Sequence, residues 1–352
     1  RLRAREAAVP EPAAGEVRLR VAAVGVNFAD VMMRRGLYPD GPRLPAVPGY
    51  EAAGVIDAVG AGVAHERLGK PALALCRFGG YSEVVCARSE LAWDLPAGSD
   101  PVRAAALPVN YLTAWQTVRV MAPVTAGDTV LVHSAAGGVG LAVVQLCRLA
   151  GARVVGTASP GKHDFLREQG VGDVFDSRDP DFPAAVRAVT DGRGVDVALE
   201  PRNGRWIMAS YRSLAKCGRL VLFGFSSAAV GRSSGLWSAV RTLAAVPWLR
   251  LNPIRLMNDN KAIAGVNLGR MWDQADRTGG WLQELLGLFA RGDIAPHIDR
   301  VYRLSEAGAA QARLETRQNV GKVILVPDGA ASGGRTDESG RRGDGSPRGG
   351  ET

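Results

Sequence analysis

Cysteine and histidine, the residues that most often bind metals or form disulfides, are scarce in this sequence. Four cysteines and four histidines are spread through 352 residues, and no two cysteines stand in a C-x-x-C pair. This spacing excludes a small disulfide-stapled fold and the usual cysteine-rich zinc motifs. The first residues also lack the apolar segment that marks a secretory signal. We therefore expect an intracellular, cytoplasmic protein with reduced thiols.

Long runs of one kind of residue are also missing. Residues 129–147 contain no Asp, Glu, Lys or Arg and reach the length of a membrane-spanning helix, but the glycine-rich turn in their middle favours a strand, a turn and a helix. The net charge of +8, from 43 basic and 35 acidic residues, is not gathered into a dense cluster. It therefore does not indicate a nucleic-acid partner. The length of the chain predicts about two domains.

What the sequence does contain is a change of pattern near residue 108. Before it, residues 16–26 and 54–60 show the alternation of half-buried strands. After it, short apolar strands alternate with helical segments, which predicts an α/β fold with a parallel sheet and crossover helices. The expected strands are 129–134, 152–157, 195–199, 219–225, 262–268 and 320–326, and the expected helices are 138–150, 162–169, 206–215 and 281–290.

Two further segments depart from this alternation. Residues 226–258 contain four arginines, no acidic residue and two tryptophans, a composition that suits either a helix lying on a membrane surface or an apolar segment covered by protein. Pro247 interrupts the segment and its arginines are dispersed, which favours the covered role over membrane association. Residues 328–352 are rich in Gly, Ser, Arg and Asp with almost no apolar residue, so we expect a disordered tail.

The most specific motif lies where the strand at 129–134 runs into the helix at 138–150. Compared with the pattern G-x-G-x-x-G, Ala135 takes the first position, Gly137 and Gly140 take the other two, and Gly138 and Val139 lie between them. Missing side chains let a pyrophosphate approach the backbone, and the helix N-terminus offers unpaired N–H groups and a partial positive charge. The flanking strand and helix favour a dinucleotide site over an ordinary strand–helix turn.

The residues at the end of the next strand indicate which of the two nicotinamide nucleotides, NADH or NADPH, the site binds. An NAD site usually has an acidic residue about 20 residues after the glycines, but residues 156–162 contain none. Thr157 and Ser159 provide hydroxyl groups there, and Lys162 provides a cation, which together suit the 2′-phosphate of NADPH. The alternative is a solvated loop with an incidental lysine. We therefore predict NADPH rather than NADH.

These residues, taken with several other short motifs, resemble the medium-chain dehydrogenase/reductase superfamily in its zinc-free quinone oxidoreductase branch. Within that branch the chain resembles the synaptic vesicle membrane protein VAT-1 homologues. The resemblance covers residues 15–327, and several motifs occur in the family's order. The matching segments are 25–30, 36–38, 45–54, 110–114, 135–140, 223–224, 296–299 and 319–322.

The resemblance implies a GroES-like, β-rich catalytic domain of residues 1–109 and 270–327, interrupted by a Rossmann NADP-binding domain of residues 110–269 with a doubly wound parallel sheet. It implies a homodimer that pairs through the strand at 262–268, and a cofactor in the cleft between the domains. Asn27, Asn110 and Thr113 would flank the nicotinamide, Gly138 and Val139 the pyrophosphate, and Gly224, Asn319 and Lys322 would close over the nicotinamide and its ribose.

The same resemblance allows a test for zinc. Zinc alcohol dehydrogenases have Gly-His-Glu, with histidine as a metal ligand, where this chain has Gly49-Tyr50-Glu51. Their catalytic cysteine is replaced by the segment 27–30, and their four-cysteine structural lobe has no counterpart. Because zinc needs about four ligands in a tetrahedral cluster, we predict no metal site. The family's Asp-x-x-Gly-Gly segment is also altered, to Glu-Pro-Arg-Asn-Gly at 200–204.

The chemistry expected without zinc is hydride delivery to an electron-poor acceptor. A quinone or an α,β-unsaturated carbonyl does not need the Lewis acid that polarises a simple carbonyl. The protein then has to orient the reactants and stabilise the oxygen on which charge develops. Tyr38 is our candidate hydrogen-bond or proton donor, although a packing role for its ring is the alternative, and Asn27 is the candidate that positions the nicotinamide or the substrate oxygen.

Two other functions fit the same residues. The pattern around Asn27 and Tyr38 is shared with enoyl reductases that act on acyl thioesters in secondary metabolism. The resemblance to VAT-1 homologues also allows a nucleotide-binding scaffold protein that associates with membranes. We favour the NADPH-dependent quinone or enone reductase over both.

Overall fold

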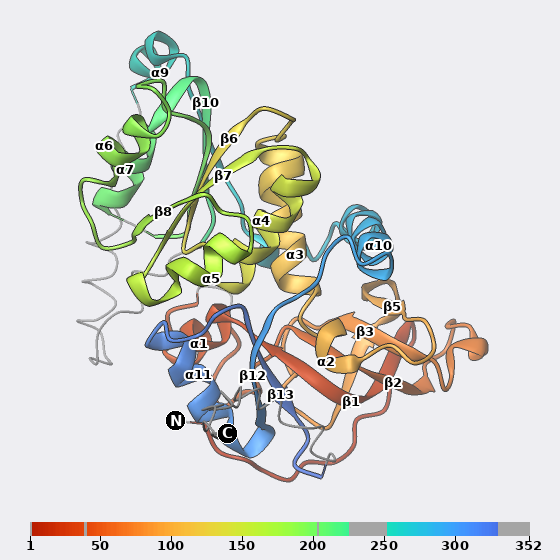
Figure 1. The fold of residues 1–352 in the computed structure, drawn as a ribbon. Helices are drawn as coiled ribbons and strands as arrows, with labels where there is room; N and C mark the ends of the chain where they lie inside the picture. The colour runs from red at the N-terminus through yellow and green to blue at the C-terminus, as the bar shows by residue number, and fades with distance from the viewer. Residues whose placement is uncertain (1, 39–40, 203, 225–251, 330–352) are drawn as a thin grey trace, which may run out of the picture.

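Two β-sheets form the framework of the computed structural model, which describes residues 2–38, 41–202, 204–224 and 252–329. Figure 1 shows one sheet in the upper part of the molecule and the other in the lower part. Most of the arginine- and tryptophan-bearing stretch 226–258 and of the predicted tail 328–352 lies outside the described residues. Within the described residues, no helix combines the length and the hydropathy needed to cross a bilayer.

The upper sheet, sheet B, is parallel throughout and has the strand order β11-β10-β9-β6-β7-β8. This order reverses direction beside β6, which creates a topological switch point at the carboxyl ends of β6 and β9. The predicted Rossmann sheet is therefore confirmed. Its strands are β6 (Thr129–His133), β7 (Arg153–Ala158), β8 (Asp173–Asp176), β9 (Val195–Glu200), β10 (Leu214–Leu222) and β11 (Ala262–Gly265).

Helices cover both faces of sheet B because its strands are apolar on both faces. Within β6, Val130 and Val132 pack toward α4 (Gly138–Leu149) and α5 (His163–Glu168), whereas Leu131 packs toward α6 (Phe182–Ala188) and α7 (Arg205–Arg212). All three side chains are fully buried. This is the reason that β6 reads as a continuous apolar run in the sequence.

The lower sheet, sheet A, brings together the two ends of the chain. Strand β13 pairs antiparallel with β1, and the sheet has the order β12-β13-β1-β2-β3-β5, with β4 also paired to β1. Its strands are β1 (Glu16–Val26), β2 (Glu51–Val59), β3 (Pro71–Leu75), β4 (Val84–Arg88), β5 (Ala92–Asp94), β12 (Ile298–Arg303) and β13 (Lys322–Val326). Helices α1 (Phe28–Arg34), α2 (Pro101–Ala104) and α11 (Ala307–Glu315) accompany this sheet.

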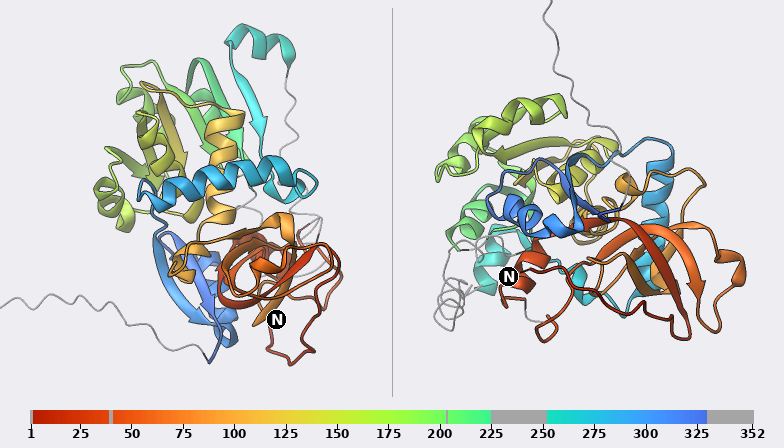
Figure 2. Two further views of the ribbon diagram at one scale, coloured as in Figure 1. Left: turned by 90° about the vertical axis from the view of Figure 1, so that its right-hand side faces the viewer. Right: turned by 90° about the horizontal axis from the view of Figure 1, so that it is seen from below.

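One hydrophobic cluster extends across both sheets, and each sheet has a second cluster of its own. The shared cluster runs from Leu73 of sheet A to Val132 of sheet B, through α3 (Pro108–Trp115) and α10 (Ala275–Ala290), which lie at the junction in Figures 1 and 2. The predicted division at residue 110 falls inside α3. The boundaries at residues 110 and 270 stay predictions.

Two predicted helices have different limits in the structure. The helix expected to reach residue 215 ends at Arg212, because Leu214 and Ala215 are buried in β10 and Leu214 pairs with Val195. The helix expected to begin at residue 281 begins six residues earlier, at Ala275. Thr278, Leu282 and Leu285 are buried along one face of it, so tertiary packing outweighs the low helix propensity of the two glycines at 279–280.

Candidate active site

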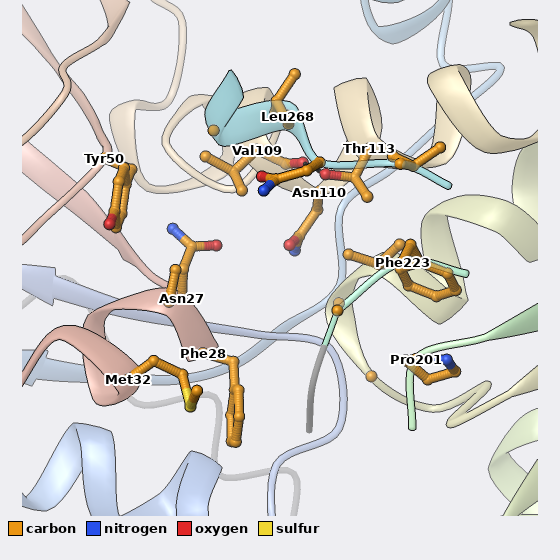
Figure 3. Close-up of a pocket in the computed structure, with 18 of the residues that line it drawn as sticks. Asn27, Phe28, Met32, Tyr50, Val109, Asn110, Thr113, Pro201, Phe223 and Leu268 are labelled. Carbon is orange, nitrogen blue, oxygen red and sulfur yellow. Dashed lines mark hydrogen bonds between the residues drawn. The ribbon is translucent and has the colours of Figure 1, made fainter. Parts of the chain in front are cut away.

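A cavity of about 630 Å³ lies between the two sheets, at the switch point of sheet B. Its walls are mostly apolar, and a few polar side chains project into it. In Figure 3 the amides of Asn27 and Asn110 point toward its open centre, and Tyr50 stands beside Asn27. This combination of apolar walls and convergent polar groups is typical of a site for a cofactor and a small substrate.

Most of the predicted site residues line this cavity, although they come from distant parts of the chain. They are Asn27, Tyr38, Asn110, Thr113, Gly137, Gly138, Val139, Gly140, Gly224, Asn319 and Lys322. The structure thus brings together the residues proposed for the nicotinamide and pyrophosphate. The three residues predicted to meet the 2′-phosphate, Thr157, Ser159 and Lys162, do not line it.

The glycine-rich turn between β6 and α4 is shaped by close packing inside the protein. A Cβ atom on Gly140 would lie 2.4 Å from the Ser134 carbonyl oxygen, and one on Gly138 would lie 2.2 Å from the Asn110 amide nitrogen. The turn therefore leaves the first N–H groups of the 12-residue helix α4 at the cavity wall, without side chains in front of them. This arrangement fits the pyrophosphate of a dinucleotide.

A buried ion pair and its hydrogen bonds join four elements at the cavity, β2, β13, α1 and α3. The ammonium group of Lys322, at the start of β13, donates to Glu51 Oε1 of β2 (2.5 Å) and to Asn27 Oδ1 (2.8 Å). The amide of Asn27 donates back to Glu51 Oε1 (2.7 Å), and the N–H of Val109 donates to Glu51 Oε2 (2.7 Å). The side chains of Glu51 and Lys322 are buried. This network fixes Asn27 and Lys322 in the orientation that they present to the cavity.

The role of Glu51 was not predicted from the sequence, in which this residue is only part of the segment Gly49-Tyr50-Glu51. The available signal was an acidic residue at the start of the apolar run of β2, together with a basic residue at the start of the equally apolar β13. Burial of an unpaired charge is costly, so each of these residues requires a partner of opposite sign. The pairing itself could not be read from residues 271 positions apart.

A second buried carboxylate, that of Asp30, joins the start of α1 to the segment before β2. It accepts hydrogen bonds from the N–H of Asn27 (2.8 Å), the N–H of Gly49 (3.0 Å) and the hydroxyl of Tyr81 (3.1 Å). Burial raises the pKa of Asp30 to about 7. Asp30 thus fixes the backbone on which Asn27 and Tyr50 are carried.

Thr157 belongs to a buried polar cluster at the carboxyl ends of β6, β7 and β9. Its Oγ1 lies 2.9 Å from Nδ1 of His133, whose Nε2 lies 3.0 Å from the Ser210 hydroxyl and 3.4 Å from Glu200. Burial lowers the pKa of His133 to about 3. Burial alone would raise the pKa of Glu200, but His133 and Arg202 lower it to about 2. The hydroxyl of Thr157 is therefore engaged inside the sheet.

The altered segment at 200–204 places an arginine at the edge of this cluster. The guanidinium of Arg202 donates from Nε and Nη2 to the two oxygens of Glu200 (2.8 and 3.0 Å) and from Nη1 to the Ser177 carbonyl oxygen (2.9 Å). It also lies 4.2 Å from the centre of the Trp206 ring. Arg202 thus links the carboxyl ends of β8 and β9, where an adenosine is expected to lie.

The buried ion pair yields a prediction about stability. Lys322→Met removes the cation and leaves the Glu51 carboxylate buried, so the free energy of unfolding should fall by about 3–5 kcal/mol. Lys70→Met is the matched control, because Lys70 pairs with Asp94 at 3.3 Å on the surface and should cost at most about 1 kcal/mol. Denaturant unfolding measures both losses. Equal losses would contradict the role of the pair, and adding Glu51→Gln to Lys322→Met should recover part of the stability.

The buried histidine yields a prediction about pH. A pKa lowered from 6.5 to about 3 means that the unfolded state binds the proton of His133 more tightly than the folded state does. Stability should therefore decrease as the pH falls below 6.5, by up to about 1.4 kcal/mol per pH unit from this group. His133→Gln should flatten the stability curve between pH 6.5 and 4.5, where Glu200 stays ionised. The exposed His65→Gln is the control, and an equal slope in both variants would contradict the assignment.

Comparison with known proteins identifies the group to which this chain belongs. A model of the alcohol dehydrogenase GroES-like domain matches residues 13–97, and a model described as zinc-binding dehydrogenase matches residues 169–325. Within the described part of the chain, however, no group of three or more His, Cys, Asp or Glu side chains is placed to hold a metal ion.

Individual relatives cover nearly the whole chain. The human synaptic vesicle membrane protein VAT-1 homolog is 37% identical over 330 residues, which is 93% of this chain and 83% of that protein. The structure of Escherichia coli quinone oxidoreductase complexed with NADPH has a TM-score of 0.80 and 29% identity, covering 92% of this chain and 94% of the other. That of CurK enoyl reductase has a TM-score of 0.77 and 30% identity, with coverage of 92% and 94%. The chain therefore belongs to the medium-chain dehydrogenase/reductase superfamily of oxidoreductases, in the group that contains the VAT-1 homologues and the quinone oxidoreductases.

Proposed function

We propose that the protein is an NADPH-dependent reductase of quinones or α,β-unsaturated carbonyl compounds. The observation that carries this proposal is a single cavity that joins the glycine-rich turn at 137–140, the polar group of Asn27 and Lys322, and an apolar chamber. NADPH, when bound, supplies the hydride. The chain's own residues bind and orient the two reactants and donate hydrogen bonds to them.

The preference for NADPH rests on the chemistry at the carboxyl end of β7. No carboxylate follows this strand through residue 162, so nothing there would repel a 2′-phosphate or bind a free 2′-hydroxyl as in NAD sites. Ser159 and Lys162 lie in this segment, the latter at the end of the helical turn Pro160–Lys162. The quinone oxidoreductase from E. coli, which has the same fold, was solved as a complex with NADPH.

The substrate end of the cavity suits a neutral, electron-poor molecule. Its walls include Met32, Leu37, Tyr50, Leu75 and Leu268, which exclude water and favour an apolar ring or chain. Hydride addition places negative charge on the acceptor's oxygen, so hydrogen-bond donors must reach that oxygen. The amide of Asn27 and the ammonium of Lys322 lie at this cavity, where Gly25, Glu51 and Asn110 are among their acceptors. A substrate oxygen would replace or share one of these acceptors.

Tyr38 is the proposed proton donor to the reduced acceptor. Its hydroxyl packs against the helical turn η5 (Leu268–Arg270), since a Cβ atom on Gly269 would lie 2.3 Å from that oxygen. Its ring stands 5.9 Å from that of Tyr50. Both rings line the cavity, so the phenol is held at the apolar end, where a substrate oxygen would lie.

An enoyl reductase acting on acyl thioesters is the second candidate. The observation in its favour is the similarity to CurK enoyl reductase, which extends over the same 92% of the chain. Reduction of a conjugated thioester is the same hydride addition to an activated double bond. The two candidates therefore differ in the substrate's tail and not in the chemistry of the residues at the cavity.

A substrate panel tests the proposal. NADPH absorbance should fall rapidly with simple quinones and enones, and slowly with crotonyl thioesters, because the apolar chamber accepts the former without a carrier. The opposite order would favour the enoyl reductase. Tight NADPH binding in a fluorescence titration, without oxidation by any acceptor, would favour a nucleotide-binding scaffold instead.

Replacement of Tyr38 tests the proton donor. Tyr38→Phe keeps the ring but removes the hydroxyl, so kcat should fall on the order of 10²-fold, the scale of general acid catalysis, with little change in the Kd of NADPH. Tyr302→Phe is the control, because Tyr302 lies in β12, outside the residues that line the cavity. An unchanged kcat in Tyr38→Phe would assign the ring a packing role only.

A further inference from the structure

Lys162 makes two hydrogen bonds that the sequence did not predict. Its ammonium group donates to the carbonyl oxygen of Arg317 (2.8 Å) and to that of Asn319 (2.7 Å). Lys162 follows β7 of sheet B, whereas both carbonyl groups belong to residues 316–321, the loop between α11 and β13 of sheet A. One side chain therefore connects the nucleotide-binding sheet to a loop of the other sheet.

The loop at 316–321 forms part of the cavity wall. Asn319 and Gly321 line the cavity, and Lys322 follows them directly. The side chain of Asn319 donates to the Gly321 carbonyl oxygen (2.9 Å), which makes the turn compact. A displacement of the loop would therefore move Asn319 and the backbone on which Lys322 is carried.

Other hydrogen bonds hold the two ends of this loop, such as that from the N–H of Gln318 to the Arg313 carbonyl oxygen (3.1 Å). On the sheet A side, the N–H of Val320 donates to Asp299 (3.0 Å), whose carboxylate also pairs with Arg313. On the sheet B side, the N–H of Gly321 donates to the Ala136 carbonyl oxygen (2.8 Å) at the end of the loop. Among the hydrogen bonds of the described residues, those of Lys162 hold the middle of the loop to sheet B.

The number of donors on the ammonium group of Lys162 permits a second ligand. An ammonium group has three N–H donors, and the two carbonyl oxygens account for two of them among the described residues. The third can donate to a phosphate oxygen without loss of either existing bond. Hydrogen bonds from a charged donor are stronger than those between neutral groups. We therefore expect the two bonds from Lys162 to the carbonyl oxygens to persist when the phosphate binds.

We propose that Lys162 is a positioning residue that fixes the loop carrying Asn319 and Lys322, in addition to binding the 2′-phosphate. The phosphate part rests on the proposed function, whereas the loop part rests on the contacts in the protein itself. One ammonium group then joins recognition of the nucleotide's distant phosphate to the position of the residues at the nicotinamide end. A lysine that acted on the phosphate alone would have no influence on the reaction of NADH.

The experiment compares Lys162→Met, Lys162→Arg and the control Lys261→Met. Lys261 also donates to a backbone carbonyl, that of Tyr211 at 3.1 Å, but both residues belong to the sheet B part of the chain. Hydrogen exchange of the nucleotide-free protein is measured for the peptide covering residues 316–322. The kcat with saturating NADH and with saturating NADPH is measured with one quinone, and the Kd of each nucleotide by titration.

We expect Lys162→Met to increase exchange in residues 316–322 several-fold and to lower kcat with NADH roughly 10-fold, below the ~10²-fold that a 1 Å misplacement can cost. Lys162→Arg should restore both values, because a guanidinium also donates to carbonyl groups. Lys261→Met should match the wild type. This pattern would support the positioning role.

Wild-type exchange and wild-type kcat with NADH in Lys162→Met would overturn the inference, even if NADPH binds more weakly. Faster exchange with unchanged kcat would also overturn it, since the loop would then move without affecting the reaction. If the wild-type protein oxidises neither nucleotide, the proposed function fails, and the exchange measurement alone decides whether Lys162 holds the loop.

Discussion

The buried pairing of Lys322 with Glu51 is the interaction on which the arrangement of the cavity depends. A buried ion pair adds little net stability, because desolvation consumes most of the electrostatic gain, but separating its members is costly. Here each carboxylate oxygen of Glu51 has a partner from a different element: Lys322 of β13 and Asn27 beside α1 for one, and the N–H of Val109 in α3 for the other. None of these elements can shift without leaving a charge or an amide unpaired.

The same end of β13 also meets the glycine-rich turn, so the charge pair and the nucleotide site are mechanically linked. Gly321 forms a parallel bridge with Gly137 and donates to Ala136. On the other side of the turn, the side chain of Asn110 lies so close to Gly138 that a Cβ atom would overlap it. The first contact joins segments that belong to the two sheets, and the second joins the turn to α3. The position of the turn relative to Asn27 and Lys322 is therefore set by packing before any ligand arrives, which is the preorganisation that orientation of two reactants requires.

The local pattern of the sequence was sufficient to predict the parallel sheet and the turn, because both depend on neighbouring residues. The apolar run of β6 predicts a buried strand, and the glycines at 137–140 predict the turn into α4, without reference to distant residues. The pairing of Glu51 with Lys322 and the cluster of His133 with Glu200 join residues that are far apart in the sequence. A polar side chain in an apolar strand indicates that a partner is needed, but it does not indicate which residue the partner is. The contacts of Lys162 were missed for another reason: its carbonyl partners carry no side-chain signal at all. The start of β10 was misassigned because burial of Leu214 outweighed a helical pattern.

The distribution of polar groups also bears on the choice between an enzyme and a nucleotide-binding scaffold. Binding of a dinucleotide needs the turn, the helix N-terminus and a cation near the adenosine. It does not need a cationic ammonium group and two asparagine amides placed at the far end of an apolar chamber. Burial of Lys322 and Glu51 costs desolvation free energy. Nucleotide binding alone does not require this buried pair. Stabilisation of a developing negative charge requires hydrogen-bond donors that are held rigidly at an apolar site. The cavity has this arrangement and therefore favours catalysis over a scaffold role.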